Sequence, residues 1–190
     1  INAQVPAKTL KEFIDYAKSN PGKLEYGSPG TGSVGHLVAA LFVARAGANV
    51  VHVPYKGGGP AISDLLGGQI PMLFGNSGEV MSNAKNERIR IIAVSTAQRM
   101  KQLPNVPAVA ELIPGFEMTA WQGTLAPART PRAIIDLLSN AIQALSKEAS
   151  VIERLDQAGV ESTTTTPEQM AAIIKAEQAV YAEAVKAAGL

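Results

Sequence analysis

The first two thirds of the chain alternate between amphipathic segments and short apolar runs. Thr9-Leu10-Lys11-Glu12 has the spacing of a capping box, in which Thr9 accepts from the amide of Glu12 and Glu12 reaches back. The pattern then predicts a helix that stops at Asn20-Pro21-Gly22. Further along, it predicts strands at 24–27, 50–53, 70–74 and 89–95, and helices at 33–46, 60–67 and 77–84. This order indicates an α/β fold with an open, mainly parallel sheet and helices on both faces.

The pattern changes after about residue 96. Three prolines interrupt the segment 96–115, where only 108–112 is expected to form a helical turn, and 119–125 reads as a strand. From residue 131 onward the chain is almost all helix, with apolar stripes along 131–147 and 167–187 and a shorter helix at 151–157. We therefore expect a compact α/β lobe at about 8–120, followed by a helical tail.

The composition narrows the functional class. The chain has 190 residues, 46% of them hydrophobic, 5% aromatic and 17% charged, with a net charge of +1. These values are typical of a globular protein, and no charge run or aromatic cluster indicates nucleic-acid binding. No apolar run approaches the roughly 20 residues of a membrane span. The absence of cysteine excludes disulfides, thiolate metal sites and cysteine nucleophiles.

The first candidate site is the loop Ser28-Pro29-Gly30-Thr31-Gly32-Ser33, between a predicted strand and a predicted helix. Such a loop points backbone amides outward, and the helix dipole adds partial positive charge, so the chemistry suits an anion. The alternative is that glycine and proline only make a tight turn while Ser33 only caps the helix. A phosphate loop of the NTPase kind is excluded because no Gly-Lys-Ser/Thr follows.

Two further loops occupy the equivalent place after the next two strands. One is Val53-Pro54-Tyr55-Lys56-Gly57-Gly58-Gly59-Pro60, and the other is Gly75-Asn76-Ser77-Gly78. The carboxyl ends of parallel strands meet at one edge of a sheet, where ligands of open α/β folds bind. Three small loops rich in backbone amides at the same edge favour an anion site over three unrelated surface turns.

Catalysis and metal binding find little support in the sequence. The two histidines, His36 and His52, are too few for a metal site, and His52 reads as a structural residue in an apolar strand. A pair formed by Ser33 and His36 lacks an orienting acid, so a small α/β hydrolase or transferase is only the alternative hypothesis. Trp121 reads as a packing residue. The carboxylates Asp15, Asp64, Glu79 and Glu111 are scattered.

Several ordered motifs resemble those of the tripartite tricarboxylate transporter receptors, also called Bordetella uptake gene (Bug) proteins. They lie at 24–37, 51–57, 64–69, 103–111, 114–117 and 125–127, and the similarity runs from Val5 to the end of the chain. Their order and spacing make the resemblance far more specific than any single motif.

The resemblance implies a periplasmic-binding-protein-like (type II) lobe, one half of a clamshell that holds a small ligand in its cleft. It implies a periplasmic receptor, not an enzyme, without cofactor, metal or catalytic residues. Its ligand would be a di- or tricarboxylate, an acidic amino acid or an aromatic acid, delivered to the membrane permease subunits of a tripartite tricarboxylate-type transporter; ligand sensing without transport is the other reading. The residues expected to bind the ligand are Ser28, Gly30, Thr31, Gly32, Ser33, His36, Tyr55, Lys56, Gly57, Asn76 and Ser77.

Two departures from the family pattern qualify this expectation. The chain begins with Ile1 and lacks a leader and the family's Pro-Phe-x-x-Gly-Gly loop. We therefore expect an inter-lobe crossing remnant at 1–7, the second lobe at 8–120, and a crossing strand with first-lobe helices at 121–190. A dimer or a first-lobe fragment supplied separately would then cover the helical stripes. Second, Gly75 stands where the family commonly has aspartate, which argues against a cationic or amino-bearing ligand.

Overall fold

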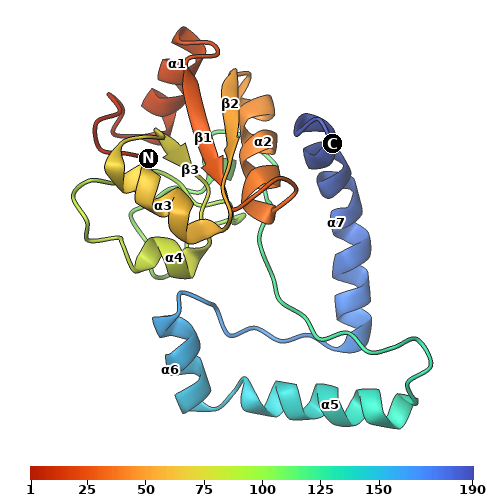
Figure 1. Ribbon diagram of the computed structural model, residues 1–190. Helices are drawn as coiled ribbons and strands as arrows, with labels where there is room; N and C mark the ends of the chain where they lie inside the picture. Colours follow the sequence, from red (N-terminus) through yellow and green to blue (C-terminus); the bar gives the residue numbers. More distant parts are fainter. The chain divides into compact units, whose positions relative to one another are not determined.

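The computed structural model describes residues 1–190, which form two compact units. The first contains Ile1–Ala120 and Val180–Leu190, and the second contains Trp121–Ala179. The first unit carries the sheet and all three of the loops considered above (Figure 1).

The sheet has three parallel strands: β1 (Leu24–Ser28), β2 (Val50–Pro54) and β3 (Met72–Leu73). Their order is β2-β1-β3, so β1 lies in the centre. Tyr26 of β1 is opposite His52 on one side and Met72 on the other. The parallel sheet expected from the sequence is confirmed, although β3 is shorter than predicted.

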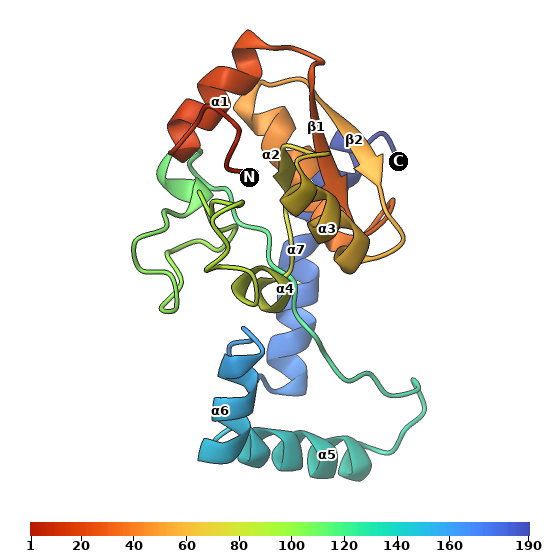
Figure 2. The same ribbon diagram turned by 60° about the vertical axis from the view of Figure 1, so that its left-hand side comes forward.

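Helices cover both faces of this sheet. They are α1 (Leu10–Ser19), α2 (Val34–Ala46), α3 (Gly58–Gly67) and the short α4 (Ser77–Met81). The chain crosses from β1 to β2 in one direction and from β2 over β1 to β3 in the other. Right-handed crossovers therefore place α2 and α3 on opposite faces, and both views show this arrangement (Figures 1 and 2).

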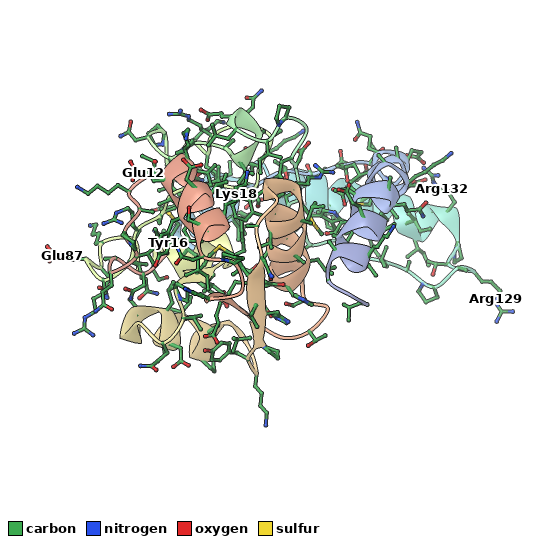
Figure 3. The ribbon with its side chains drawn as sticks, turned by 90° about the horizontal axis from the view of Figure 1, so that it is seen from above. Glu12, Tyr16, Lys18, Glu87, Arg129 and Arg132 are labelled. Atoms are coloured by element: carbon green, nitrogen blue, oxygen red, sulfur yellow. The ribbon has the colours of Figure 1, made fainter.

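The capping box predicted at the start of α1 forms only in part. The Glu12 amide donates to Thr9 Oγ1 over 3.2 Å, as expected, but the Glu12 carboxylate accepts from the Lys8 amide and not from that of Thr9. Glu12 and Lys18 of this helix, both labelled in Figure 3, are exposed. Leu10, Phe13 and Ala17 are buried.

Helix α2 is the centre of the hydrophobic core. Ser33 caps its start through the His36 amide, and Gly47 ends it in the left-handed conformation with φ of 64°. The helix is apolar on almost every side, which is typical of a helix surrounded by other elements. Phe42 contacts Phe13 of α1 at 6.5 Å and Phe116 at 6.4 Å between ring centroids. Ala184 near the C-terminus is also fully buried in this cluster.

The strands expected at 89–95 and 119–125 do not form. The first segment makes only isolated bridges, Asn2 with Ile89 and Val94 with Ala108. Val94 donates to the Pro107 carbonyl over 3.0 Å and accepts from the Val109 amide over 2.9 Å, but Pro107 has no N–H with which to continue the ladder. Residues 121–125 are exposed and assigned to no element. Prediction from apolar runs alone therefore gave more strands than the sheet contains.

The second unit is built from α5 (Arg132–Leu145), α6 (Ala149–Gln157) and most of α7 (Pro167–Ala187). Arg132 bridges Asp136 and Glu168, and Trp121 donates from Nε1 to Glu177 over 2.8 Å. Trp121 is 43% exposed, so it does not pack in the core. The apolar stripe of α5 is also exposed, reaching 68% at Leu137. None of these helices, nor any other in the chain, combines the length and the apolar character that crossing a membrane requires.

The packing of α1 on α2 gives the first prediction. Phe13 is 1% exposed, so Phe13→Ala removes a ring from a closed core and should lower the free energy of unfolding by about 3–5 kcal/mol. Urea denaturation followed by circular dichroism measures this loss. Leu112→Ala is the control because Leu112 is 46% exposed, and it should cost less than about 1 kcal/mol. Equal losses in the two variants would contradict the assignment of Phe13 to the core.

Candidate ligand-binding site

The three loops meet at the carboxyl edge of the sheet. Ser28, the last residue of β1, is opposite Pro54, the last residue of β2. The first two loops are joined by hydrogen bonds from the Tyr55 amide to the Ser28 carbonyl, 3.0 Å, and from the Gly57 amide to the Pro29 carbonyl, 2.9 Å. The third loop is equally close, since a Cβ built on Gly35 in the first turn of α2 would lie 2.7 Å from the Phe74 carbonyl oxygen.

Most backbone amides of the first loop donate hydrogen bonds to acceptors in the loop itself or in the first turn of α2. The Gly30 amide donates to Ser28 Oγ over 3.2 Å, the Gly32 amide to His36 Nδ1 over 3.0 Å, and the Ser33 amide to the Gly30 carbonyl over 3.1 Å. The exposed Thr31 amide has no protein partner. The expectation that this loop points free amides outward therefore holds for Thr31 but not for Gly30, Gly32 and Ser33, whose amides are bonded within the turn.

The second loop leaves more amides free. Gly57 has φ of 113° and ψ of 171°, a conformation that is almost restricted to glycine. The Gly57 amide is taken by Pro29, but those of Lys56, Gly58 and Gly59 have no protein acceptor. Gly58 and Gly59 open α3, so their N–H groups carry the partial positive charge of the helix start.

Tyr55 points away from these amides. Its hydroxyl donates to Asp64 of α3 over 2.7 Å, and its ring carbon Cε2 would lie 3.3 Å from a Cβ built on Gly27. Burial and the Asp64 carboxylate raise the pKa of Tyr55 to about 12. Among the residues expected to bind a ligand, Tyr55 therefore has its hydroxyl occupied by Asp64. Lys56 next to it is exposed and can reach an anion at this edge.

The third loop places Asn76 at the start of α4, with Ser77 next to it. Gly75 is explained by packing, because a Cβ there would lie 2.8 Å from Val80 Cγ2. Glu79, which sequence reasoning had set aside as a scattered carboxylate, lies against Gly58 of the second loop. The available signal was its position, directly after a third loop of the same kind.

Two histidines lie directly beneath the first loop. The rings of His36 and His52 are stacked, with centroids 3.7 Å apart and planes 8° apart, and His52 also stacks on Tyr26 at 5.0 Å. His52 Nε2 is 2.7 Å from Ser28 Oγ. Burial lowers the pKa of His36, and burial together with the His36 ring lowers the pKa of His52 to about 4. Both rings are therefore neutral near pH 7, and His52 is more closely tied to the loop than the sequence indicated.

This arrangement suits binding more than catalysis. Ser33 Oγ donates to the Gly30 carbonyl over 2.7 Å and accepts from the His36 amide, so no Ser33–imidazole pair exists. Ser28 does contact an imidazole, but it is fully buried and His52 has no carboxylate partner. No cluster of three metal-ligating side chains is present. What remains is an edge lined with small residues and uncommitted N–H donors.

An open parallel α/β lobe with amide-rich loops at its carboxyl edge is typical of the lobes of periplasmic binding proteins. The chain matches the model of the tripartite tricarboxylate transporter family receptor over residues 1–190. It therefore belongs to the family of tripartite tricarboxylate transporter receptors, which is a family of receptors and not of enzymes.

Known proteins agree with this assignment. The chain is 37% identical over 172 residues to the UPF0065 protein in the tcbD-tcbE intergenic region of Pseudomonas sp. strain P51, covering 90% of this chain and 51% of that protein. Among solved structures, R. palustris Rpa4515 with adipate is 32% identical with a TM-score of 0.88, covering 99% of this chain and 63% of that one.

Two further structures are similar. The periplasmic binding protein BugD is 31% identical with a TM-score of 0.82, covering 99% of this chain and 64% of its own. MatC (Rpa3494) from Rhodopseudomonas palustris with bound malate is 26% identical with a TM-score of 0.76, covering 98% and 64%. The chain thus spans about half the length of the curated relative and under two thirds of these structures.

The stacked histidines give a prediction for stability against pH. The pKa of His52 in the folded chain, about 4, lies below its ordinary value of 6.5. Between these values the unfolded chain binds more protons than the folded chain, so the free energy of unfolding should fall as the pH decreases from 6.5 to about 4. It should be insensitive to this histidine above pH 6.5.

Urea denaturation at pH 7.5, 5.5 and 4.5 measures this dependence, with His52→Gln as the comparison. Glutamine keeps a polar side chain near Ser28 but does not titrate, so the decrease between pH 6.5 and 4 should become smaller in the variant. Identical pH profiles for the two proteins would show that His52 is protonated freely in the folded state.

Proposed function

We propose that the chain is the ligand-holding part of a periplasmic receptor that binds a small carboxylate through backbone amides. The observation that carries this proposal is the set of unpaired N–H groups of Thr31, Lys56, Gly58 and Gly59 on two loops joined by hydrogen bonds. Carboxylate oxygens accept readily from such donors, and the start of α3 adds a favourable dipole.

The family relationship supports a carboxylate over other anions. Adipate is bound by one structural neighbour and malate by another, although both neighbours are longer than this chain. The exposed Lys56 ammonium and the amides of α3 supply the positive potential, and the neutral histidines add none. Two or three such donors can hold one carboxylate of a small ligand.

The proposal extends to the whole receptor. Family membership supports delivery of the ligand to the permease subunits of a tripartite tricarboxylate-type transporter, and the BugD neighbour supports a periplasmic location. The exposed apolar stripe of α5, which includes Ile134, Leu138 and Leu145, would be covered by a first lobe or by a second copy of the chain. Burying such side chains contributes about 1.5–3 kcal/mol each, which gives this face a strong tendency to associate.

Calorimetric titration with a panel of di- and tricarboxylates tests the proposal. Gly57→Ala should weaken binding at least tenfold, because an alanine at φ of 113° forces the loop to rearrange and moves the amides of Gly58 and Gly59. Binding that survives Gly57→Ala unchanged would show that these amides do not hold the ligand, and no heat with any carboxylate would count against the function itself.

Gly115→Ala is the matched control. Gly115 also has a positive φ, 75°, with nothing near its Cβ position, but it lies outside the three loops. Its substitution carries a similar kind of backbone strain and should leave the affinity within about twofold of the unmodified chain. A comparable loss in both variants would indicate a general effect on stability.

A further inference from the structure

One carboxylate of the chain faces the proposed binding edge without a complete set of partners. Glu79 lies in the first turn of α4, and its side chain packs against Gly58 at the start of α3. A Cβ built on Gly58 would lie 2.5 Å from Glu79 Oε2, so only glycine leaves room for the carboxylate. Glu79 therefore sits beside the free amides that the proposed function assigns to the ligand.

The Oε2 atom of Glu79 is buried and has no hydrogen-bond partner. It is the only buried side-chain nitrogen or oxygen in the chain of which this is true. A buried, unpartnered carboxylate oxygen loses its hydration without compensation, at a cost that a single donor would remove. No group of the chain donates to it, although the unpaired amides of Gly58 and Gly59 lie nearby.

We infer that Glu79 is a specificity-determining residue that selects carboxylates bearing a hydroxyl or ammonium donor, an inference that rests on the proposed function. The ligand's carboxylate oxygens accept from the amides of α3, and its donor group donates to Glu79 Oε2, which a turn of the side chain away from Gly58 exposes. A carboxylate without a donor would instead bring one negative charge close to another and leave Oε2 unpaired. Donors and acceptors thus lie side by side on two elements, α3 and α4.

This inference differs from an expectation drawn from the sequence. Gly75 lacks the aspartate that is common in the family, and this had argued against an amino-bearing ligand. Glu79 lies four residues later, about one helical turn on, and returns a carboxylate to the same edge. The packing of Val80 on Gly75 and of Glu79 on Gly58 shows that both loops are shaped around this α4 turn.

The test compares ligands that differ by a single group. Succinate, malate and aspartate share the same four-carbon dicarboxylate and carry no donor, a hydroxyl and an ammonium, respectively. Calorimetry should show malate, aspartate or both binding at least tenfold more tightly than succinate, since a site that hydrogen-bonds a donor discriminates against ligands lacking it. Preference for malate alone assigns the donor as hydroxyl, and preference for aspartate alone assigns it as ammonium.

Glu79→Ala should reduce this ratio to below about threefold while the affinity for succinate stays the same or rises. Gly58→Ala should have the same effect on the ratio, because the added methyl displaces the Glu79 carboxylate. Gly67→Ala, at the other end of α3, is its matched control, since a Cβ there would meet no atom closer than Gln69 Cγ at 3.9 Å, and it should keep the ratio of the unmodified chain. Should the Glu79→Ala chain fail to fold by circular dichroism, Glu79→Gln and the aspartate-to-succinate ratio replace it.

Equal binding of all three ligands by the unmodified chain would overturn the role of Glu79 and leave the proposed function intact. A tenfold preference that persists in Glu79→Ala would do the same. Failure of the unmodified chain to bind any of the three, or any other carboxylate, would instead overturn the proposed function and this inference with it.

Discussion

The parallel pairing of β1 with a neighbour on each side is the constraint on which the rest of the structure depends. It brings the ends of three strands to one edge, so that three separate loops become one surface. It also fixes which helices follow those loops, because the crossovers must run over opposite faces. The starts of α2, α3 and α4 consequently lie near one another without any direct requirement on the loop sequences. The glycines follow from the same crowding: Gly35 faces the Phe74 carbonyl, and Gly58 faces Glu79.

The first two loops at this edge have different roles. The first is closed by its own hydrogen bonds, with Ser28 and His36 accepting two of its amides and the His36–His52 stack supporting it from below. Such internal bonds hold the loop in one conformation before a ligand arrives, which reduces the ordering cost of binding. The second loop contributes most of the free donors, at Lys56, Gly58 and Gly59. The rigid first loop thus supports the second loop, which carries the free donors. Hydrogen bonds at Ser28 and Pro29 join the two loops.

The sequence predicted the parts of this arrangement that depend on local pattern. The sheet, the boundaries of α2 and α7 and the meeting of the three loops followed from hydrophobic periodicity, Ser33 and Gly47 as caps, and the rule for strand ends. The sequence prediction failed where pairing between distant segments determines the structure. The apolar segment 89–95 forms no strand because the segment it pairs with contains Pro107. In the same way, loop composition could not reveal that Tyr55 bonds to Asp64, or that His36 accepts from Gly32. Glu79 was missed because its significance comes from Gly58, twenty-one residues earlier in the chain.

The charges at the edge point to recognition by geometry more than by net attraction. Lys56 is exposed, the histidines are neutral near pH 7, and Glu79 adds a negative charge close to the free amides. A site built only to attract anions would exclude such a carboxylate, because opposing charges at short range would raise the affinity and like charges lower it. Its presence is consistent with a ligand that both accepts and donates hydrogen bonds, for which amides and carboxylate are complementary partners. Specificity then arises from the penalty that Glu79 imposes on ligands without a donor, while the amides supply attraction common to all carboxylates.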